Sequence, residues 1–403
     1  MGGAWKSYLV GTTGAGGRSL FALDVTDAAG FSSSKVKWEF THADLGYTLS
    51  RPVVARMANG RWAAITGNGL DSSSGTAKIF IVYLDAALND AGGWDAGSDY
   101  CVLTTDATAS NGMGSPAVIM SESGAAEYIY AGDIQGRMWR FNIADSSGNC
   151  PTAWKPHEVF KAVNASNKVQ PITAAPTVGL APEEGVMVVF GTGKFSEVND
   201  PTEKATQTLY GVHDLFGSSP KLTRSHLVEQ TITRQTTTSF KNTETKSSYT
   251  EEIRETSENP VDFASKKGWY LDLVNMTSGS PVQEGERVIA QPQIRWGNVI
   301  FTTYVPSDDS CAAGGTSWIF AMDVKTGQRK DPYFDLNRSG TFTTDDNYSG
   351  GKKATTAIHY GLGGPPVFVN NGEKTFVLKS DDGNLKPRQT RGQPPLAAWR
   401  QIK

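Results

Sequence analysis

Short apolar segments separated by glycine, aspartate and serine recur along the chain, and the clearest group lies between Ser115 and Gly148. Its apolar segments run from Ala117 to Met120, from Tyr128 to Ala131 and from Met138 to Ile143. Segments of this length, bounded by turn-forming residues, predict β-strands joined by tight turns. The sequence therefore predicts an antiparallel sheet of three or four strands in this stretch.

A proline that precedes an apolar strand marks the start of each repeat of this pattern. The prolines are Pro52, Pro116, Pro176, Pro292 and Pro365, and their spacings are 64, 60, 116 and 73 residues. Proline cannot donate to a sheet ladder, so it suits the first position of a strand. Because the gap of 116 residues is close to twice the shorter spacings, we expect one further, degenerate copy inside it.

Repeats of strand-rich units at this spacing predict sheets stacked radially, since one sheet alone cannot bury both of its faces. Counting a copy that begins mid-unit at Met1 and one that ends at Lys403, we expect an all-β β-propeller of about seven four-stranded blades, some of them degenerate. The pattern of Leu23, Asp24 and Trp38 resembles the repeat of quinoprotein-type propellers, so we expect the fold to be quinoprotein-like. We expect a single domain over residues 1–403. Because the first copy begins mid-blade, we also expect the chain to be a fragment of a longer, secreted protein.

Composition narrows the class of partner. Apolar residues make up 38% and aromatic residues 10% of the 403 residues, and there are 43 glycines, which fits a turn-rich β protein. The formal net charge of -3 provides no broad basic field, so we do not expect a nucleic-acid partner. No apolar run is long enough for a transmembrane helix, which needs about 18 residues or more.

The three cysteines, Cys101, Cys150 and Cys311, show no CxxC spacing. Because no histidine cluster accompanies them, we do not expect a zinc site. Cys101 and Cys150 flank the same predicted copy and would pair in an oxidising compartment. The alternative is that both are small buried thiols.

Residues 215–267 interrupt the repeat. Between residues 230 and 258 threonine, serine, glutamate and lysine dominate. This composition predicts a long exposed hairpin, because threonine is a strand former that need not be buried. The alternative is a disordered insert.

The segment from Phe334 to Asp346 carries the clearest ligand pattern. With Asp335 as position 1 of a twelve-residue loop, the ligand positions of a calcium loop hold Asp335, Asn337, Ser339, Thr341 and Asp346. Gly340 takes position 6, where the loop turns sharply, and Phe342 the apolar position 8. Because only two ligands are charged, we expect calcium affinity on the order of 0.1 to 1 mM. The alternative is a polar turn that satisfies its own backbone.

No catalytic constellation accompanies this loop. The five histidines are scattered along the chain, without a serine or cysteine motif beside them: His42, His157, His213, His226 and His359. Isolated histidines are more often surface or core residues than catalysts. We therefore do not expect an enzyme.

Several longer segments resemble one known family. They are QPITAAP (170–176), VFGTGK (189–194), YAGDIQGRMWRF (130–141), NPVDFASKKGWYLDL (259–273), GERV (285–288) and FDLN (334–337). These motifs are similar to the C-terminal propeller of the PilY/PilC family of type IV pilus biogenesis factors and tip adhesins. The resemblance runs from Gly3 to Ile402.

This resemblance implies a calcium-responsive protein, secreted or on the outer surface or outer membrane of a Gram-negative bacterium. Family members oppose pilus retraction, promote pilus assembly, support twitching motility and in several cases adhere to host cells or surfaces. The implied partners are type IV pilus components such as minor pilins, host-cell or abiotic surfaces, and the N-terminal domain of the same protein.

One departure from the family concerns calcium. Many relatives carry an acidic calcium loop immediately before the YAGD segment, whereas this chain has Ile119, Ser121, Ser123 and Glu127 there. A hard cation needs a cluster of carboxylate oxygens, and one glutamate does not supply it. We expect that site to be lost or much weakened, which leaves the Asp335 loop as the candidate.

Two other functions compete with the pilus interpretation. The pattern of Leu23, Asp24 and Trp38 resembles quinoprotein dehydrogenases, whose quinone is held above calcium, often over a vicinal disulfide, and this chain has no adjacent cysteines. A lectin propeller would rest only on the ten tryptophans, most of which we expect to lie between blades.

Overall fold

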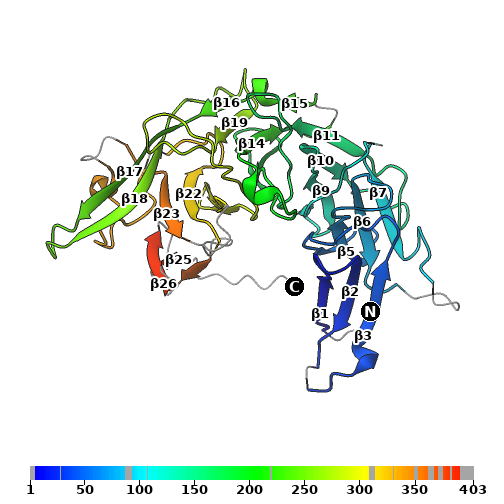
Figure 1. Ribbon diagram of the computed structural model, residues 1–403. Helices are drawn as coiled ribbons and strands as arrows, with labels where there is room; N and C mark the ends of the chain where they lie inside the picture. The colour runs from blue at the N-terminus through cyan, green and yellow to red at the C-terminus, as the bar shows by residue number, and fades with distance from the viewer. Residues whose placement is uncertain are drawn as a thin grey trace. The chain divides into compact units, whose positions relative to one another are not determined.

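The computed structural model describes residues 5–27, 29–86, 93–106, 108–217, 220–307, 314–329, 331–348, 353–361, 367–370, 375–381 and 384–390. Within these residues the strands form six sheets, and Figure 1 draws their strands coloured by residue number. Short 3-10 helices lie between strands: η1 (Ser33–Lys35), η2 (Asp200–Thr202), η3 (Arg224–His226) and η4 (Thr344–Asp346). Among the residues described, no helix is long and apolar enough to cross a membrane.

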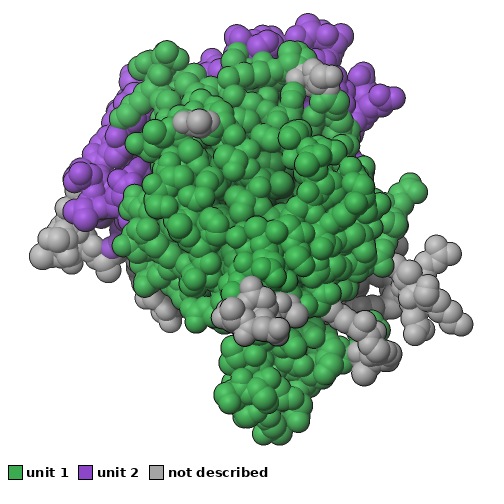
Figure 2. Space-filling model, turned by 90° about the vertical axis from the view of Figure 1, so that its right-hand side faces the viewer, with its two compact units in different colours: residues 1–176, 216–223 green, residues 177–215, 224–403 purple. Residues whose placement is uncertain are grey.

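The chain's contacts divide it into two compact units, residues 1–176 with 216–223 and residues 177–215 with 224–403, which Figure 2 colours separately. We describe each unit by itself. The prediction of one domain over residues 1–403 stays a prediction.

The first unit contains three sheets. The first has the order β1 (Tyr8–Thr12), β2 (Ser19–Asp24), β3 (Val36–Thr41). The second has the order β4 (Val53–Arg56), β5 (Trp62–Gly67), β6 (Lys78–Tyr83), β7 (Tyr100–Thr104). The third has the order β8 (Ala117–Met120), β9 (Ala126–Gly132), β10 (Arg137–Asn142), β11 (Pro156–Lys161), β15 (Leu222–Thr223), and its last pair is parallel.

The second unit contains the other three sheets. The fourth sheet has the order β12 (Thr177–Leu180), β13 (Val186–Gly191), β14 (Thr208–Asp214), β19 (Gly268–Asp272), β16 (Val228–Gln230). The fifth has the order β20 (Gln293–Arg295), β21 (Asn298–Thr302), β22 (Ser317–Asp323), β23 (Ala357–Gly361), β18 (Ser248–Thr256), β17 (Ile232–Lys241). The sixth has the order β24 (Phe368–Asn370), β25 (Thr375–Asp381), β26 (Asn384–Thr390).

The predicted strand starts agree with this arrangement. Pro52, Pro116, Pro176 and Pro292 each stand directly before the first strand of a sheet. A proline at this point costs no ladder hydrogen bond, because the strand has not yet begun to pair. Pro365 lies outside the described residues.

The number of sheets differs from the prediction of about seven: the described residues form six. The expected extra copy inside the 116-residue gap was wrong. That gap holds the fourth sheet, and the hairpin of β17 and β18 is inserted between the sheet's strands β16 and β19 and joins the edge of the fifth sheet. An insertion of strand-forming residues therefore produced the spacing of a missing repeat.

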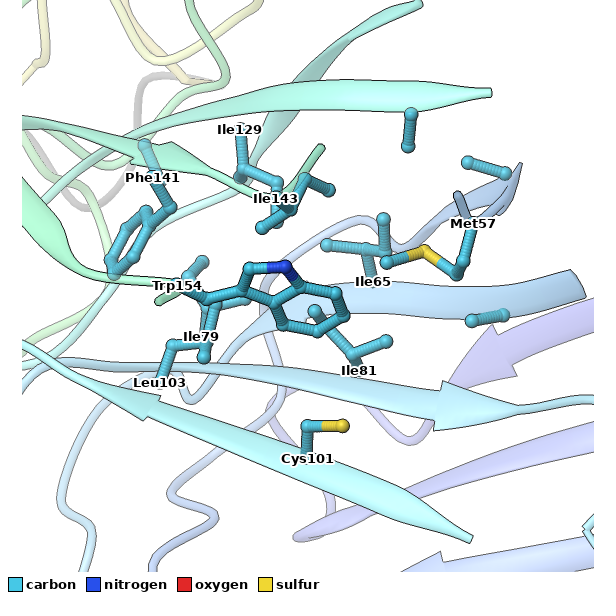
Figure 3. Close-up of a cluster of buried hydrophobic side chains, with 14 of the residues drawn as sticks. Met57, Ile65, Ile79, Ile81, Cys101, Leu103, Ile129, Phe141, Ile143 and Trp154 are labelled. Atoms are coloured by element: carbon cyan, nitrogen blue, oxygen red, sulfur yellow. The ribbon is translucent and has the colours of Figure 1, made fainter. Parts of the chain in front are cut away.

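Apolar side chains from neighbouring sheets form the core of the first unit. Trp154, which is 5% exposed, lies against Ile65 of β5 and Ile81 of β6, as Figure 3 shows. Side chains from β9 and β10, including Phe141, complete the cluster. A sheet is stabilised on such a face only when another sheet covers it, so the repeats depend on their neighbours.

A disulfide joins Cys101 of β7 to Cys150, with 5.6 Å between the two Cα atoms. Of the two alternatives for these cysteines, the structure has the disulfide. Cys311 lies outside the described residues.

The threonine-rich insertion forms an antiparallel hairpin rather than a disordered insert, with pairing from Ile232 and Thr256 to Lys241 and Ser248. Figure 1 shows it extending past β23, the strand that pairs with β18 through Ile253 and Arg254. The turn of the hairpin, residues 243–248, is exposed, whereas Arg254 at its base is fully buried.

Candidate functional site

The predicted calcium loop lies between Phe334 and the end of η4. The structure buries three of the five predicted ligands, with Asp335 4%, Asn337 2% and Asp346 1% exposed. Ser339 is partly exposed and Thr341 is exposed, and their hydroxyl oxygens lie 2.8 Å apart. The loop therefore brings two carboxylates and one amide inside, while its two hydroxyl residues lie at the surface.

Both carboxylates accept hydrogen bonds from the loop backbone. The N–H groups of Ser339 and Gly340 donate to the two oxygens of Asp335, each over 2.9 Å. The N–H of Leu336 donates to Oδ1 of Asp346 over 2.8 Å, and the N–H of Thr343 donates to Oδ2 over 3.1 Å. Gly340 has φ +80, a left-handed conformation that glycine adopts without steric cost. These bonds shape the loop as the polar-turn alternative requires.

The two carboxylates still have lone pairs available to a cation, because a carboxylate has about four lone-pair sites and the backbone uses only some of them. Burial raises the pKa of Asp346, backbone hydrogen bonds act against that rise, and the nearby charge of Asp335 adds to it. A divalent cation relieves the repulsion between two neighbouring carboxylates such as Asp335 and Asp346. Within the described part of the chain, no cluster of three or more His, Cys, Asp or Glu side chains has metal-binding geometry.

The segment that aligns with the family's calcium loop is a tight turn between β8 and β9. The N–H of Ser121 donates to the carbonyl of Ala125 over 2.8 Å, and the hydroxyls of Ser121 and Ser123 lie 2.9 Å apart. The guanidinium of Arg56 donates to the carbonyl oxygen of Ser123 over 3.1 Å. The positive charge of Arg56 beside this turn would repel a calcium ion, in line with the expectation of a site that is lost or much weakened.

The YAGD segment places a buried carboxylate at the turn between β9 and β10. Oδ2 of Asp133 accepts hydrogen bonds from the indole N–H of Trp139 over 2.8 Å and from the amide of Asn111 over 2.9 Å. Oδ1 accepts from the N–H of Arg137 over 2.8 Å. Asp133 is 0% exposed, and burial raises its pKa even though these hydrogen bonds act in the opposite direction. The Asp133 carboxylate therefore stabilises this turn and fixes the position of the Trp139 indole.

We expect Asp133→Asn to lower the free energy of unfolding by about 1–2 kcal/mol at pH 7, because one oxygen becomes an NH₂ group that cannot accept a buried N–H. The raised pKa of Asp133 means that the wild type loses stability as pH rises from about 4 through the folded-state pKa, since the native state holds the proton more tightly. The Asp133→Asn variant has no titrating group at this position. Its loss in free energy of unfolding relative to the wild type should therefore be larger at pH 5 than at pH 8. Urea unfolding at both values measures this, and a deficit that grows with pH would contradict it.

Sequence reasoning missed the most deeply buried ion pair of the second unit. Arg254 and Glu286 are 0% and 1% exposed, and Nη1 of Arg254 lies 2.8 Å from each carboxylate oxygen of Glu286. Its Nε donates to Oε1 of Gln235 over 2.9 Å, and the guanidinium lies 3.9 Å from the ring centre of Trp318. No local signal identifies this pair, because its partners come from the hairpin and a distant loop.

Comparison with known proteins gives the family. Residues 1–245 match the model of the PilY1 beta-propeller domain. Among curated relatives, a type IV pilus biogenesis factor PilY1 homolog of Xylella fastidiosa is 34% identical over 93% of this chain and 26% of that protein. The type IV pilus biogenesis factor PilY1 of Pseudomonas aeruginosa is 35% identical over 95% of this chain and 34% of that protein. The chain thus spans about a quarter to a third of the length of these relatives.

A solved structure covers nearly the whole chain. The crystal structure of the Pseudomonas aeruginosa PilY1 C-terminal domain has a TM-score of 0.81 at 30% identity, covering 98% of this chain and 82% of that chain. This likeness confirms the predicted all-β propeller. PilY1 factors are a non-enzymatic family, which confirms the prediction of no enzyme. The chain belongs to the family of PilY1 β-propeller domains.

Proposed function

We propose that this propeller is the C-terminal part of a type IV pilus biogenesis factor that promotes pilus extension by opposing retraction, and so supports twitching motility and adhesion to surfaces or host cells. The observation that carries the proposal is the likeness to the PilY1 C-terminal domain over 98% of the chain. The partners in this role are minor pilins, the surfaces that the pilus meets, and the N-terminal part of the same protein.

The disulfide between Cys101 and Cys150 supports a location outside the cytoplasm, at the pilus or the outer surface of a Gram-negative bacterium. Disulfides form and persist in oxidising compartments, whereas cytosolic thiols are kept reduced. Cys101 is 3% exposed and belongs to the buried cluster of the first unit. The disulfide is therefore part of the fold rather than an exposed, exchangeable bond.

Calcium is the second part of the proposal. Asp335, Asn337, Ser339, Thr341 and Asp346 would hold the ion, with the two buried carboxylates as its charged ligands. Two charges and three neutral oxygens suit a weak, extracellular-type affinity on the order of 0.1 to 1 mM. Bound calcium would neutralise two like charges and so stabilise the loop.

The loop packs against the threonine-rich hairpin. The amide of Asn242 donates to the carbonyl of Arg338 over 3.1 Å, and the guanidinium of Arg338 lies 4.1 Å from the ring centre of Tyr249. Phe240 of the hairpin shares one buried cluster with Leu336 of the loop. Calcium in the loop would therefore act first on the hairpin, which is the route we propose for calcium response.

An in-frame deletion of these 403 residues from the gene of the full-length protein, in its source bacterium, tests the pilus role. We expect the strain to lose surface pili and twitching, and re-expression of the intact protein to restore both. Because the proposed role is to oppose retraction, pili should also return when the retraction motor is inactivated. Normal piliation and twitching in the deletion strain would contradict the proposal.

A further inference from the structure

A shallow hollow in the second unit lies beside the first strands of two neighbouring sheets, β12 and β20. It is lined by Thr177 and residues 291–296 and has a volume of about 500 Å³, which is within the range of small-ligand sites. The two strands contact each other closely, since a Cβ on Gly179 would lie 2.6 Å from Cδ1 of Ile294. First strands of neighbouring blades converge in this way at the channel of a propeller, where ligands are readily enclosed.

Arg295 gives the hollow its charge. Its guanidinium is partly buried and lies 4.1 Å from the ring centre of Phe368. No described residue forms a hydrogen bond or ion pair with this guanidinium, and no carboxylate lines the hollow. Stacking on one face leaves the guanidinium edge free to donate in its plane, which is the geometry that binds a carboxylate through two hydrogen bonds.

Trp296 gives the hollow an aromatic face. It is 51% exposed and occupies the first position of the two-residue turn between β20 and β21, with φ +52, followed by Gly297 with φ +74. Two left-handed residues define a turn that favours Asn-Gly, and a bulky residue at the first position is rare. Neither the turn nor core packing explains an indole at this position.

We propose that this hollow binds a saccharide that carries a carboxylate, of the uronic acid type. The C–H face of a pyranose stacks on the indole of Trp296, and the sugar carboxylate accepts two hydrogen bonds from Arg295. Thr177 lines the same hollow with a hydroxyl group that can exchange hydrogen bonds with a sugar hydroxyl. A neutral sugar would not pair with the Arg295 guanidinium, and a peptide carboxylate would not place a sugar ring on the Trp296 indole. This site is separate from the calcium loop and from the pilus role.

Calorimetric titration with a trimer of galacturonic acid, beside the neutral trimer of galactose, tests the proposal on the whole chain. We expect saturable binding of the acidic trimer, and weakening by about tenfold or more for the neutral trimer, for Trp296→Asn and for Arg295→Gln. Trp296→Asn installs the residue that the turn prefers, so its fold is preserved. Trp62→Thr is the matched control, because Trp62 is 43% exposed in β5 of the other unit and does not line the hollow.

Three results would overturn the proposal. One is no saturable binding of the acidic trimer up to about 10 mM, well above the range of a specific weak site. Another is equal binding of the acidic and neutral trimers, or equal binding by the wild type and both variants. The third is tighter binding of a peptide with a free C-terminal carboxylate than of the sugar, which would assign the hollow to a protein partner.

Discussion

Replacing Cys101 and Cys150 together by serine is expected to lower the free energy of unfolding of the first unit by about 4 kcal/mol, from the loop of 49 residues that the disulfide closes. Without the bond, the unfolded chain regains the freedom of that loop, while the native contacts stay the same. We expect few single substitutions in this chain to lower the free energy of unfolding by as much.

The surroundings of the bond add to this effect. Cys101 is 3% exposed and belongs to the buried cluster that contains Trp154 and the isoleucines of β5 and β6. A serine hydroxyl at that position would be buried among apolar side chains, which costs free energy when it has no hydrogen-bond partner. Relative to the oxidised wild type, the double serine variant should therefore lose slightly more free energy of unfolding than the reduced wild type does.

Urea unfolding of the oxidised wild type, the reduced wild type and the double variant measures the difference. Cys311→Ser is the control, and it should leave the oxidised protein unchanged because Cys101 and Cys150 are already paired. A loss below about 1 kcal/mol on removing the bond would lie outside the usual range for a native disulfide and would contradict the account.

Glu286→Ala is expected to lower the free energy of unfolding of the second unit by about 3–5 kcal/mol, because it leaves the guanidinium of Arg254 buried without its counter-charge. The two groups are removed from water, and the carboxylate accepts from Nη1 through both of its oxygens. Since Arg254 also contacts Gln235 and Trp318, its side chain cannot turn to solvent without breaking the hairpin's base.

A matched variant separates the charge from the packing. Arg254→Met combined with Glu286→Leu replaces both groups by apolar side chains of similar volume, and we expect it to be more stable than either single variant, because no uncompensated charge remains. Denaturant unfolding of the single and double variants completes the cycle. A double variant that loses the sum of the two single losses would show that the pair is not coupled.

The strands were predictable because their signals are local. The segment from Ala117 to Met120 was predicted with the bounds that β8 has, and the prolines marked the first strands, since apolar runs and turn residues are read from neighbouring positions. The count of sheets was not predictable from spacing alone. The hairpin that fills the 116-residue gap has the strand propensity of a repeat, and only its pairing with β23 assigns it to the fifth sheet.

The candidate site was predictable in part for the same reason. The spacing from Asp335 to Asp346 predicted a twelve-residue loop, and the structure buries both carboxylates. The sequence offered the pairing of Cys101 with Cys150 as one of two alternatives. The pairing of Arg254 with Glu286 joins residues that are distant in sequence, so it depends on how the sheets pack. The role of Trp296 depends on a backbone angle, which the sequence does not display.

Calorimetric titration of calcium into the chelator-treated chain tests the central claim, that the Asp335 loop is the calcium site, most directly. We predict one bound ion with a dissociation constant on the order of 0.1 to 1 mM. Asp335→Asn, which keeps one of the two acceptors for the loop backbone, should abolish the binding. Asp345→Ala, at an exposed position of η4 outside the ligand set, should keep it. No saturable heat up to about 10 mM, or unchanged binding by Asp335→Asn, would contradict a calcium site in this loop.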